Sequence, residues 1–301
     1  MDHLRDIPAV LRLEIRRSIG SLRGILVLLI YLFVSLGVGT FYVTAVRALE
    51  EQVVKAVANE GGMGGAARGA IDISKTDAYK KLVQSFTEGD SAKEELWLNT
   101  PPIVLISFYF GLLMLPLLIL LSAHDVLARD TELRTSRFLR PKTSAVSWVI
   151  GKFLAQTLLI FLATVLSGVV MYLIAIRKLE SFDAIPGLWA FTRFWGRLLI
   201  SEIGFLGVMF LLSSIAATSF TALMMSGLAT MGLWLIHFFS YLKDGDVLRP
   251  AGYLCYLSPF TYRTGLWMPF GKELLEAAGA FACFAVLGLA ATIYRERVKD
   301  A

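Results

Sequence analysis

Long runs of apolar residues alternate with short polar segments along the chain, without the stripe spacing of amphipathic helices in a soluble domain. Each run is close to the roughly 20 residues that an α-helix needs to cross the hydrocarbon core of a bilayer. A helix satisfies its own backbone hydrogen bonds there. The pattern therefore predicts an all-α, polytopic membrane protein with six transmembrane helices. The predicted spans are Gly24–Val46, Ile103–Ala123, Trp148–Ile176, Phe194–Ala216, Phe220–Tyr241 and Leu274–Tyr294.

Three of these spans carry features that set expectations for their shape. Pro116 lies inside the second span, where it should kink the helix and release a backbone carbonyl. Arg197 and Glu202 fall in the first turns of the fourth predicted span. The fourth span ends at Ala216 and the fifth begins at Phe220, so this pair should form a tight hairpin.

An amphipathic helix is predicted before the first span. Its apolar positions recur every three or four residues, which places them on one helical face: Leu4, Ile7, Leu11, Ile15, Ile19 and Leu22. Such a helix lies among the lipid headgroups, where its arginines meet anionic lipid. The residues proposed for this role are Arg5, Arg12, Arg16 and Arg17. The helix is either a simple membrane anchor or an elbow that couples motion of the first span to a cytoplasmic partner.

Composition and charge support this class. The chain has 301 residues, of which 56% are hydrophobic and only 18% charged, and a mean hydropathy of +0.65. A soluble domain of this length needs more charged surface. The net charge of +5 is explained by cytoplasmic loops rather than by nucleic acid, which is not an expected partner. Two cysteines are too few for a disulfide framework, and no metal site is predicted.

The distribution of basic residues predicts the orientation. Arginine and lysine are dense before the first span, between the second and third spans, and after the sixth. Six crossings place these three segments on one side, which the positive-inside rule identifies as the cytoplasm. We therefore expect a multi-pass protein of the cell inner (cytoplasmic) membrane with both ends in the cytoplasm.

The extramembrane segments complete the predicted organisation of residues 1–301 as a single transmembrane domain. A short helix is expected within the outer connection, over Thr76–Phe86, and broken, partly re-entrant structure over Tyr253–Phe270. The predicted segments are 1–23 (cytoplasmic elbow helix), 47–100 (extracytoplasmic connection), 124–147 (cytoplasmic coupling loop) and 242–273 (extracytoplasmic re-entrant segment).

The cytoplasmic loop is the most informative segment for function. It is dense in charges of both signs, yet it keeps Leu133, Phe138 and Leu139 as apolar side chains. A loop that only contacts water has no need of them, and the cores of protein interfaces favour aromatic residues and arginine. The loop is thus either a solvated charged connection or a docking surface for a soluble partner.

A family resemblance starts in the same region. The residues that carry it are Pro116–Leu121, then Asp125, then Asp130-x-Glu132-x-x-Thr135, then Pro141, then Gly151–Leu154. The order resembles the type-2 ABC-transporter permeases, nearest in pattern to those of nitrous-oxide-reductase maturation and gliding motility. In that pattern, an acidic segment of the form E-x-E-x-G-T follows the second span, then a turn with proline, then a Gly-Lys pair that opens the third. This chain has Asp130 where Glu is usual, Arg134 where Gly is usual, and a shortened turn before Pro141.

The resemblance implies a permease subunit that works with separate ATP-binding subunits and with a second permease copy, as a homo- or heterodimer. The sequence contains no G-x-x-x-x-G-K-[ST] phosphate loop, so the chain is not expected to be an enzyme or to bind a cofactor. ATP and Mg would be bound by the partner subunit, and lipids would surround the permease. The residues assigned to coupling with the ATPase subunit are Asp125, Asp130, Glu132, Arg134, Thr135 and Phe138.

Charged residues inside the fourth span suggest a translocation path. Glu202 is costly if it faces lipid, so it should face a path or a partner. Glu202 either pairs with Arg197 near the outer interface or lies on the path with it. Two other functions stay open: a membrane scaffold that binds a cytoplasmic partner without transport, and an intramembrane enzyme. The enzyme would need convergent catalytic groups within the spans, which an isolated Glu202 does not provide.

Overall fold

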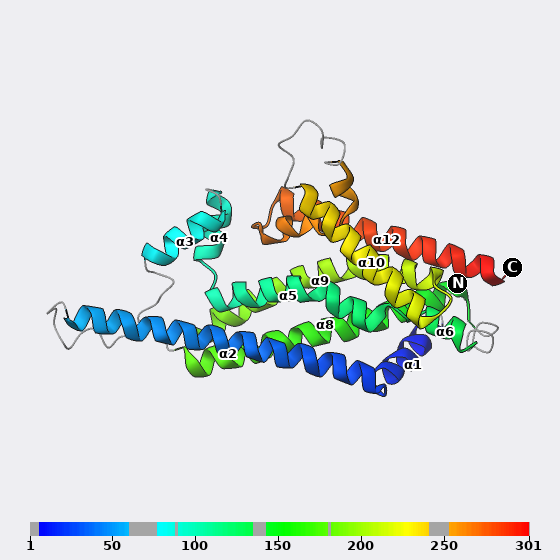
Figure 1. Ribbon diagram of the computed structural model, residues 1–301, viewed down its shortest axis with the longest axis horizontal. Coiled ribbons are helices and arrows are strands. Elements are labelled where there is room, and N and C mark those ends of the chain that lie inside the picture. The colour runs from blue at the N-terminus through cyan, green and yellow to red at the C-terminus, as the bar shows by residue number, and fades with distance from the viewer. Residues whose placement is uncertain are drawn as a thin grey trace. The chain divides into compact units, whose positions relative to one another are not determined.

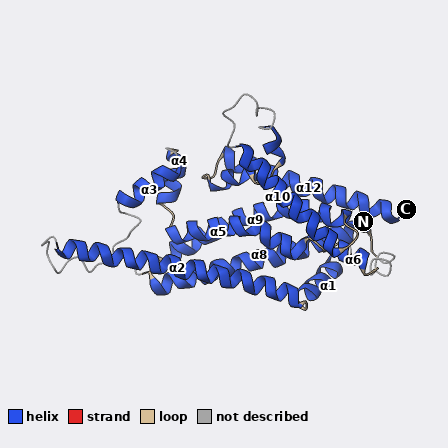
Figure 2. Cartoon of the chain, viewed as in Figure 1, coloured by secondary structure: helices blue, strands red, loops and turns tan. Residues whose placement is uncertain are grey.

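The computed structural model describes residues 6–59, 77–87, 90–134, 143–179, 182–240 and 253–300 (Figures 1 and 2), and these residues form helices and connecting turns without strands. The helices are α1 (Ile7–Ile19), α2 (Leu22–Asn59), α3 (Asp77–Thr87), α4 (Ser91–Leu98), α5 (Pro102–Ala123), α6 (Ala128–Glu132), α8 (Ala145–Lys178), α9 (Ala184–Ile215), α10 (Ser219–Ser240), η5 (Cys255–Leu257), η6 (Thr261–Trp267) and α12 (Lys272–Asp300).

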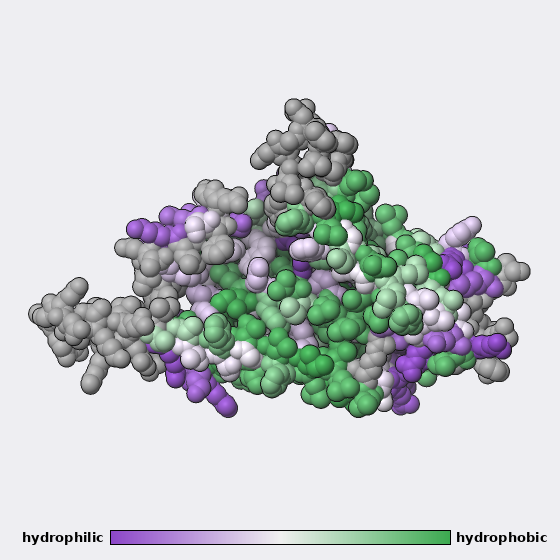
Figure 3. Space-filling model, viewed as in Figure 1, coloured by the Kyte–Doolittle hydropathy of each residue, from purple (hydrophilic) through white to green (hydrophobic). Residues whose placement is uncertain are grey.

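Six of these helices, α2, α5, α8, α9, α10 and α12, are long and apolar enough to cross a membrane. Hydrophobic side chains that a soluble protein would bury lie on their surface; Phe33 and Phe41 of α2 are 76% and 77% exposed. Figure 3 shows hydrophobic residues over much of the visible face. The predicted all-α fold with six spans and a short helix before the first is confirmed.

Several local predictions can be checked against the helix bounds. The short helix expected at Thr76–Phe86 is confirmed as α3, and the tight connection between α9 and α10 is confirmed as well. The expected start of the fourth span was wrong, because α9 begins at Ala184 rather than Phe194. Pro186 lies in its first turn, where a helix tolerates proline because the N–H groups there have no partner within the helix. Arg197 and Glu202 therefore lie in the middle of α9.

The chain divides into two compact units. The first comprises Met1–Leu29, Leu112–Leu162 and Arg197–Ala301. Within it, α9 and α12 approach closely at glycines: a side chain on Gly288 would fall on the backbone of Gly207. Small residues allow this contact between helices in a membrane, where dispersion forces drive packing.

The irregular segment after α10 also packs inside the first unit. Its two short 3₁₀-helices, η5 and η6, agree with the broken structure predicted over Tyr253–Phe270. The Ser258 hydroxyl donates to the Leu233 carbonyl of α10 at 2.8 Å. The Arg263 guanidinium lies over the rings of Phe205 and Phe260, at 5.7 and 5.0 Å from their centroids. These contacts attach the segment to α9 and α10.

The second unit comprises Ile30–Gly111 and Ala163–Gly196. In it, α2 and α8 lie against each other, and the hydroxyls of Ser35 and Ser167 are hydrogen-bonded at 2.5 Å while both residues are buried. Aromatic rings add contacts to α5 and α9, with Tyr31 stacked on Phe110 at 5.7 Å between centroids. The segment between α2 and α5 contributes α4, whose N-terminus is capped by the Asp90 side chain.

Candidate coupling site

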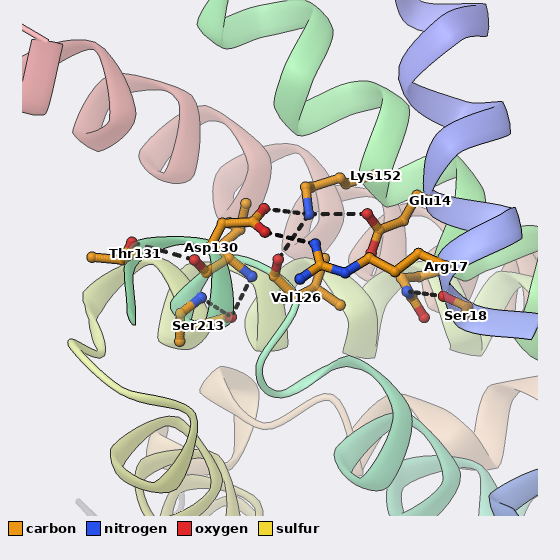
Figure 4. A network of polar contacts seen from close by, with 11 residues as sticks. Glu14, Arg17, Ser18, Val126, Asp130, Thr131, Lys152 and Ser213 are labelled. Atoms are coloured by element: carbon orange, nitrogen blue, oxygen red, sulfur yellow. Dashed lines mark hydrogen bonds and ion pairs between the residues drawn. The ribbon is translucent and has the colours of Figure 1, made fainter. Parts of the chain in front are cut away.

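A buried lysine organises the polar centre of the first unit (Figure 4). Lys152, in the second turn of α8, is fully buried. Its ammonium lies 2.6 Å from Oδ2 of Asp130, donates to Oε2 of Glu14 at 3.1 Å, and donates to the Val126 carbonyl at 2.9 Å. An ammonium has three donors. Two of these donors form hydrogen bonds, and the ion pair with Asp130 compensates the charge inside the protein.

Arg17 completes the cluster. Its Nη1 donates to Oδ1 of Asp130 at 2.7 Å, so the two carboxylate oxygens of Asp130 face two different cations. Burial lowers the pKa of Arg17, but the hydrogen bond and the charge of Asp130 outweigh burial and raise that pKa above its ordinary value. We call Glu14, Arg17, Asp130 and Lys152 the ion cluster; two positive and two negative charges balance within it.

The ion cluster joins three segments that are distant in the sequence. Glu14 and Arg17 come from α1, Asp130 from α6, and Lys152 from α8. Packing holds α1 at this place, because Val10 is buried and lies against Gly151. A side chain at Gly151 would collide with Val10 and approach the Ile7 carbonyl. The Gly-Lys pair at positions 151 and 152 thus has two roles: close approach of α1 and charge compensation.

The turn that carries Asp130 is also attached to α9. The Ser213 hydroxyl accepts hydrogen bonds from the backbone N–H groups of Leu127 and Ala128, at 3.0 and 3.3 Å. These N–H groups belong to the start of α6 and have no partner within that helix. Ala128 packs in a small buried cluster with Ala216 and Ala222. The turn is therefore held by backbone and apolar contacts as well as by charge.

A second acidic residue ties the end of the same turn to α10. The Glu132 carboxylate accepts from the backbone N–H of Ser219 at 2.8 Å and from its hydroxyl at 2.6 Å. Ser219 is the first residue of α10, so the negative charge lies at a helix N-terminus, where the helix dipole favours it. Residues 124–134, which we call the coupling turn, thus contact α1 and α8 on one side and α9 and α10 on the other.

Arg134 has an unusual backbone conformation at the end of the coupling turn. Its φ is 55°, the left-handed region that favours glycine. Arg134 directly follows Leu133, the C-cap of α6. The residue after the C-cap is where helices commonly end in a left-handed glycine. A glycine at this position, as in the resembling pattern, would adopt this conformation without strain.

The structure brings some predicted coupling residues together and separates others. Asp125 and Asp130 are buried, whereas Glu132 and Arg134 are exposed. Thr135 and Phe138 lie outside the described residues. Of the predicted interface arginines, Arg12 and Arg16 are exposed, Arg17 belongs to the ion cluster, and Arg5 lies outside the described part.

Sequence reasoning missed the roles of Glu14 and Lys152. A usable signal existed in both cases. Glu14 is a carboxylate one turn from Leu11 and Ser18 on a helix that packs against protein, and Lys152 is a lone cation near the start of an otherwise apolar span. Charges in such places need a partner. The sequence does not indicate that Glu14 and Lys152 pair with each other.

The predicted path residues lie in the middle of α9. Nη1 of Arg197 donates to the Leu266 carbonyl of η6 at 2.8 Å, and Arg197 is buried. Glu202 is fully buried, and neither of its carboxylate oxygens has a hydrogen-bond partner among the described residues. The simpler alternative, an Arg197–Glu202 pair, is therefore not formed. Arg197 instead fastens the irregular segment to α9.

Comparison with known proteins identifies the family of the chain. The family model described as ABC-2 family transporter protein matches residues 8–243, which is well over half of the chain and includes the whole ion cluster. No curated protein matches the sequence at a significant level. With six spans and a matching family model, the chain belongs to the ABC-2 transporter family and is a membrane permease subunit of an ABC transporter.

Proposed function

We propose that this permease couples ATP hydrolysis by separate ATP-binding subunits to export or movement of a substrate across the inner membrane, and that the coupling turn is where the ATPase acts. The observation that carries the proposal is the ion cluster. It connects the coupling turn to α1 and α8 through the buried charges of Glu14, Asp130 and Lys152 and the partly exposed Arg17. Displacement of the turn would therefore displace both helices.

The exposed side of the coupling turn supports a docking role. Arg129, Glu132 and Arg134 are exposed there, and Leu133 is 54% exposed between them. An exposed leucine surrounded by charges of both signs is the composition of a small interface core with a polar rim. Asp130, by contrast, positions the turn from inside, and its predicted contact with the ATPase becomes an indirect one. Thr135 and Phe138 stay assigned to docking from the sequence.

In this proposal, the two sets of contacts that the coupling turn makes convert docking of the ATPase into transport. The turn has two sets of attachments: charged contacts to α1 and α8, and hydrogen bonds to α9 and α10. Closure of the ATPase pair would shift the coupling turn relative to the helices of one set, while the helices of the other set move together with the turn. Glu202 and Arg197 lie deep in α9 and are proposed to face the path that opens. A second permease copy would supply the other half of that path.

The branch of the family is part of the same proposal. The pattern around Asp130-x-Glu132 is nearest to permeases of nitrous-oxide-reductase maturation and gliding motility, so transmission of force and export of a substrate are both compatible with the coupling turn. The arginines Arg12 and Arg16 of α1 would contact anionic lipid on the cytoplasmic side.

The test is association with the ATP-binding subunit. We expect the tagged permease to co-purify from native membranes, in stoichiometric amount, with a protein that contains a phosphate loop. Arg129→Glu combined with Leu133→Asp should reduce the bound ATPase at least tenfold, because the interface core would then carry a buried charge. Lys81→Glu, the reversal of an exposed charge in α3, is the matched control and should leave association unchanged.

Two results would contradict the proposal at different levels. Undiminished binding of the ATPase by the Arg129→Glu, Leu133→Asp variant would remove the coupling turn from the interface. The absence of any phosphate-loop protein in the wild-type assembly would leave a membrane scaffold as the better explanation.

A further inference from the structure

A groove lies between α2 and α8 in the second unit. Its volume is about 460 Å³, within the range of small-molecule sites. Away from its basic end, the walls are formed by Thr40, Val43 and Thr44 of α2 and by Val170, Leu173 and Ile174 of α8, so four of these six side chains are apolar. The groove therefore accepts an apolar chain rather than a hydrated solute.

Contacts on both sides of the groove keep the helices at a fixed separation. On one side, the Ser35–Ser167 hydrogen bond and the close approach of Gly39 to Met171 hold α2 against α8. On the other, Arg47 donates from Nε and Nη2 to the Lys178 carbonyl at 2.9 and 2.7 Å. The groove lies between these contacts, so its walls are braced at both ends.

The Arg47 end of the groove is strongly basic. Arg47, Arg177 and Lys178 line it together. Arg177 and Lys178 are exposed, and no carboxylate among the described residues forms an ion pair with them. The candidate spans end here as well, at Ala48 for α2 and Lys178 for α8. Basic side chains at the end of a span lie at the depth of lipid headgroups.

We propose that this groove binds an anionic phospholipid, with an acyl chain along the apolar walls and the phosphate between Arg177 and Lys178. The four apolar side chains favour a ligand with an acyl chain over a soluble anion, which would leave them uncovered. Three cations favour a headgroup with net negative charge over a zwitterionic one, whose own cation would be repelled. This site does not depend on the ATPase or on the coupling turn.

The experiment measures lipid binding to the purified full-length permease by native mass spectrometry. Delipidated protein is titrated with phosphatidylglycerol, with phosphatidylcholine, and with glycerol 3-phosphate as a competitor without acyl chains. A basic residue near an anionic headgroup contributes roughly fivefold in affinity, so Arg177→Gln with Lys178→Gln should weaken binding of phosphatidylglycerol about 30-fold. Arg177→Lys keeps the charge and should retain most of the affinity.

Two further variants separate the headgroup from the groove. Thr44→Trp places a large ring in the groove from an exposed position and should abolish binding of both lipids. Arg193→Gln removes an exposed cation of α9 that does not line the groove, so it should bind phosphatidylglycerol as the wild type does. Thermal unfolding of each variant checks that it is folded.

The proposal is overturned by any of three results. The first is equal affinity for phosphatidylglycerol and phosphatidylcholine, and the second is wild-type affinity in the Arg177→Gln, Lys178→Gln variant. The third is displacement of the lipid by glycerol 3-phosphate at equal concentration, which would make the site one for soluble anions.

Discussion

Lys152 of α8 and Asp130 of α6 form an ion pair of 2.6 Å in which the two side chains are 0% and 2% exposed. Such a pair costs desolvation energy on both sides and is favourable only when the remaining polar atoms are satisfied. Glu14, Arg17 and the Val126 carbonyl provide those contacts. Together with these contacts, the pair holds α1, α6 and α8 in one arrangement. Its contribution to the specificity of this arrangement is larger than its contribution to the free energy of unfolding.

Loss of Lys152 alone should be severe. Lys152→Met leaves the carboxylates of Glu14 and Asp130 buried with Arg17 as their one remaining cation in the ion cluster. Breaking a buried pair on one side costs about 3–5 kcal/mol of unfolding free energy. Lys272→Met is the matched control, because Lys272 is 87% exposed in a surface pair with Glu276 and should have no measurable effect. Denaturation in mixed micelles measures both, and equal stabilities would contradict the role of the ion cluster.

Removal of both partners should recover stability but not coupling. In Asp130→Asn with Lys152→Met, the charges of Glu14 and Arg17 still balance, so the double variant should be more stable than Lys152→Met alone by at least about 1 kcal/mol. The coupling turn would then lack its link to α8. We expect the assembled transporter to hydrolyse ATP without transport, measured in proteoliposomes. Normal coupling in this variant would show that the ion cluster serves only the fold.

The left-handed backbone of Arg134 gives a prediction of opposite sign. A non-glycine residue in this region costs about 1–2 kcal/mol, part of which glycine gives back through its freedom in the unfolded chain. Arg134→Gly should therefore raise the unfolding free energy by about 0.5–1 kcal/mol. Arg129→Gly removes another exposed arginine, but from within α6, and should lower stability. A thermal shift of the same sign in both variants would argue against backbone strain at Arg134.

The six spans were predictable because a bilayer allows so few solutions. An apolar run of about 20 residues has to be a helix, whatever its neighbours are. The start of α9 was not predictable on the same ground, since a helix that continues into the interface needs no apolar run. Arg134 differs from both cases. The glycine that the resembling pattern has at this position indicates a left-handed backbone, whereas an arginine by itself does not.

The ion cluster could not be predicted from the sequence. Glu14 and Lys152 are 138 positions apart, and nothing local to either residue identifies the other. The coupling loop was recognised through its charges, but the sequence cannot tell a charge that faces a partner from one that is neutralised inside. Asp130 and Glu132 are two residues apart and differ in this respect: one is buried in the cluster, and the other caps α10 from an exposed position.

The contact between α9 and α12 can be tested with two glycines of one helix. Gly288→Ala would place a methyl group on the Gly207 backbone, which cannot move aside as a side chain can. Forcing the helices apart should lower the unfolding free energy by about 1–3 kcal/mol. Gly279→Ala, in the same helix but with open space around it, should raise it by about 0.5–1 kcal/mol. Unfolding of the two variants in mixed micelles provides the comparison, and two stabilisations would exclude the close contact.

Glu202 is fully buried, and its carboxylate has no hydrogen-bond partner among the residues that the structure describes, so stability and function should separate there. An apolar residue in its place removes the burial penalty, so Glu202→Leu should unfold less readily than the wild type, by about 1 kcal/mol or more. If Glu202 lies on the translocation path, the same variant should lose transport. Ser201→Ala is the control, because the adjacent hydroxyl is also fully buried and has no hydrogen-bond partner in the described part of the chain. Its removal should leave transport intact. A Glu202→Leu permease that is both more stable and fully active would show that this carboxylate has no part in the path.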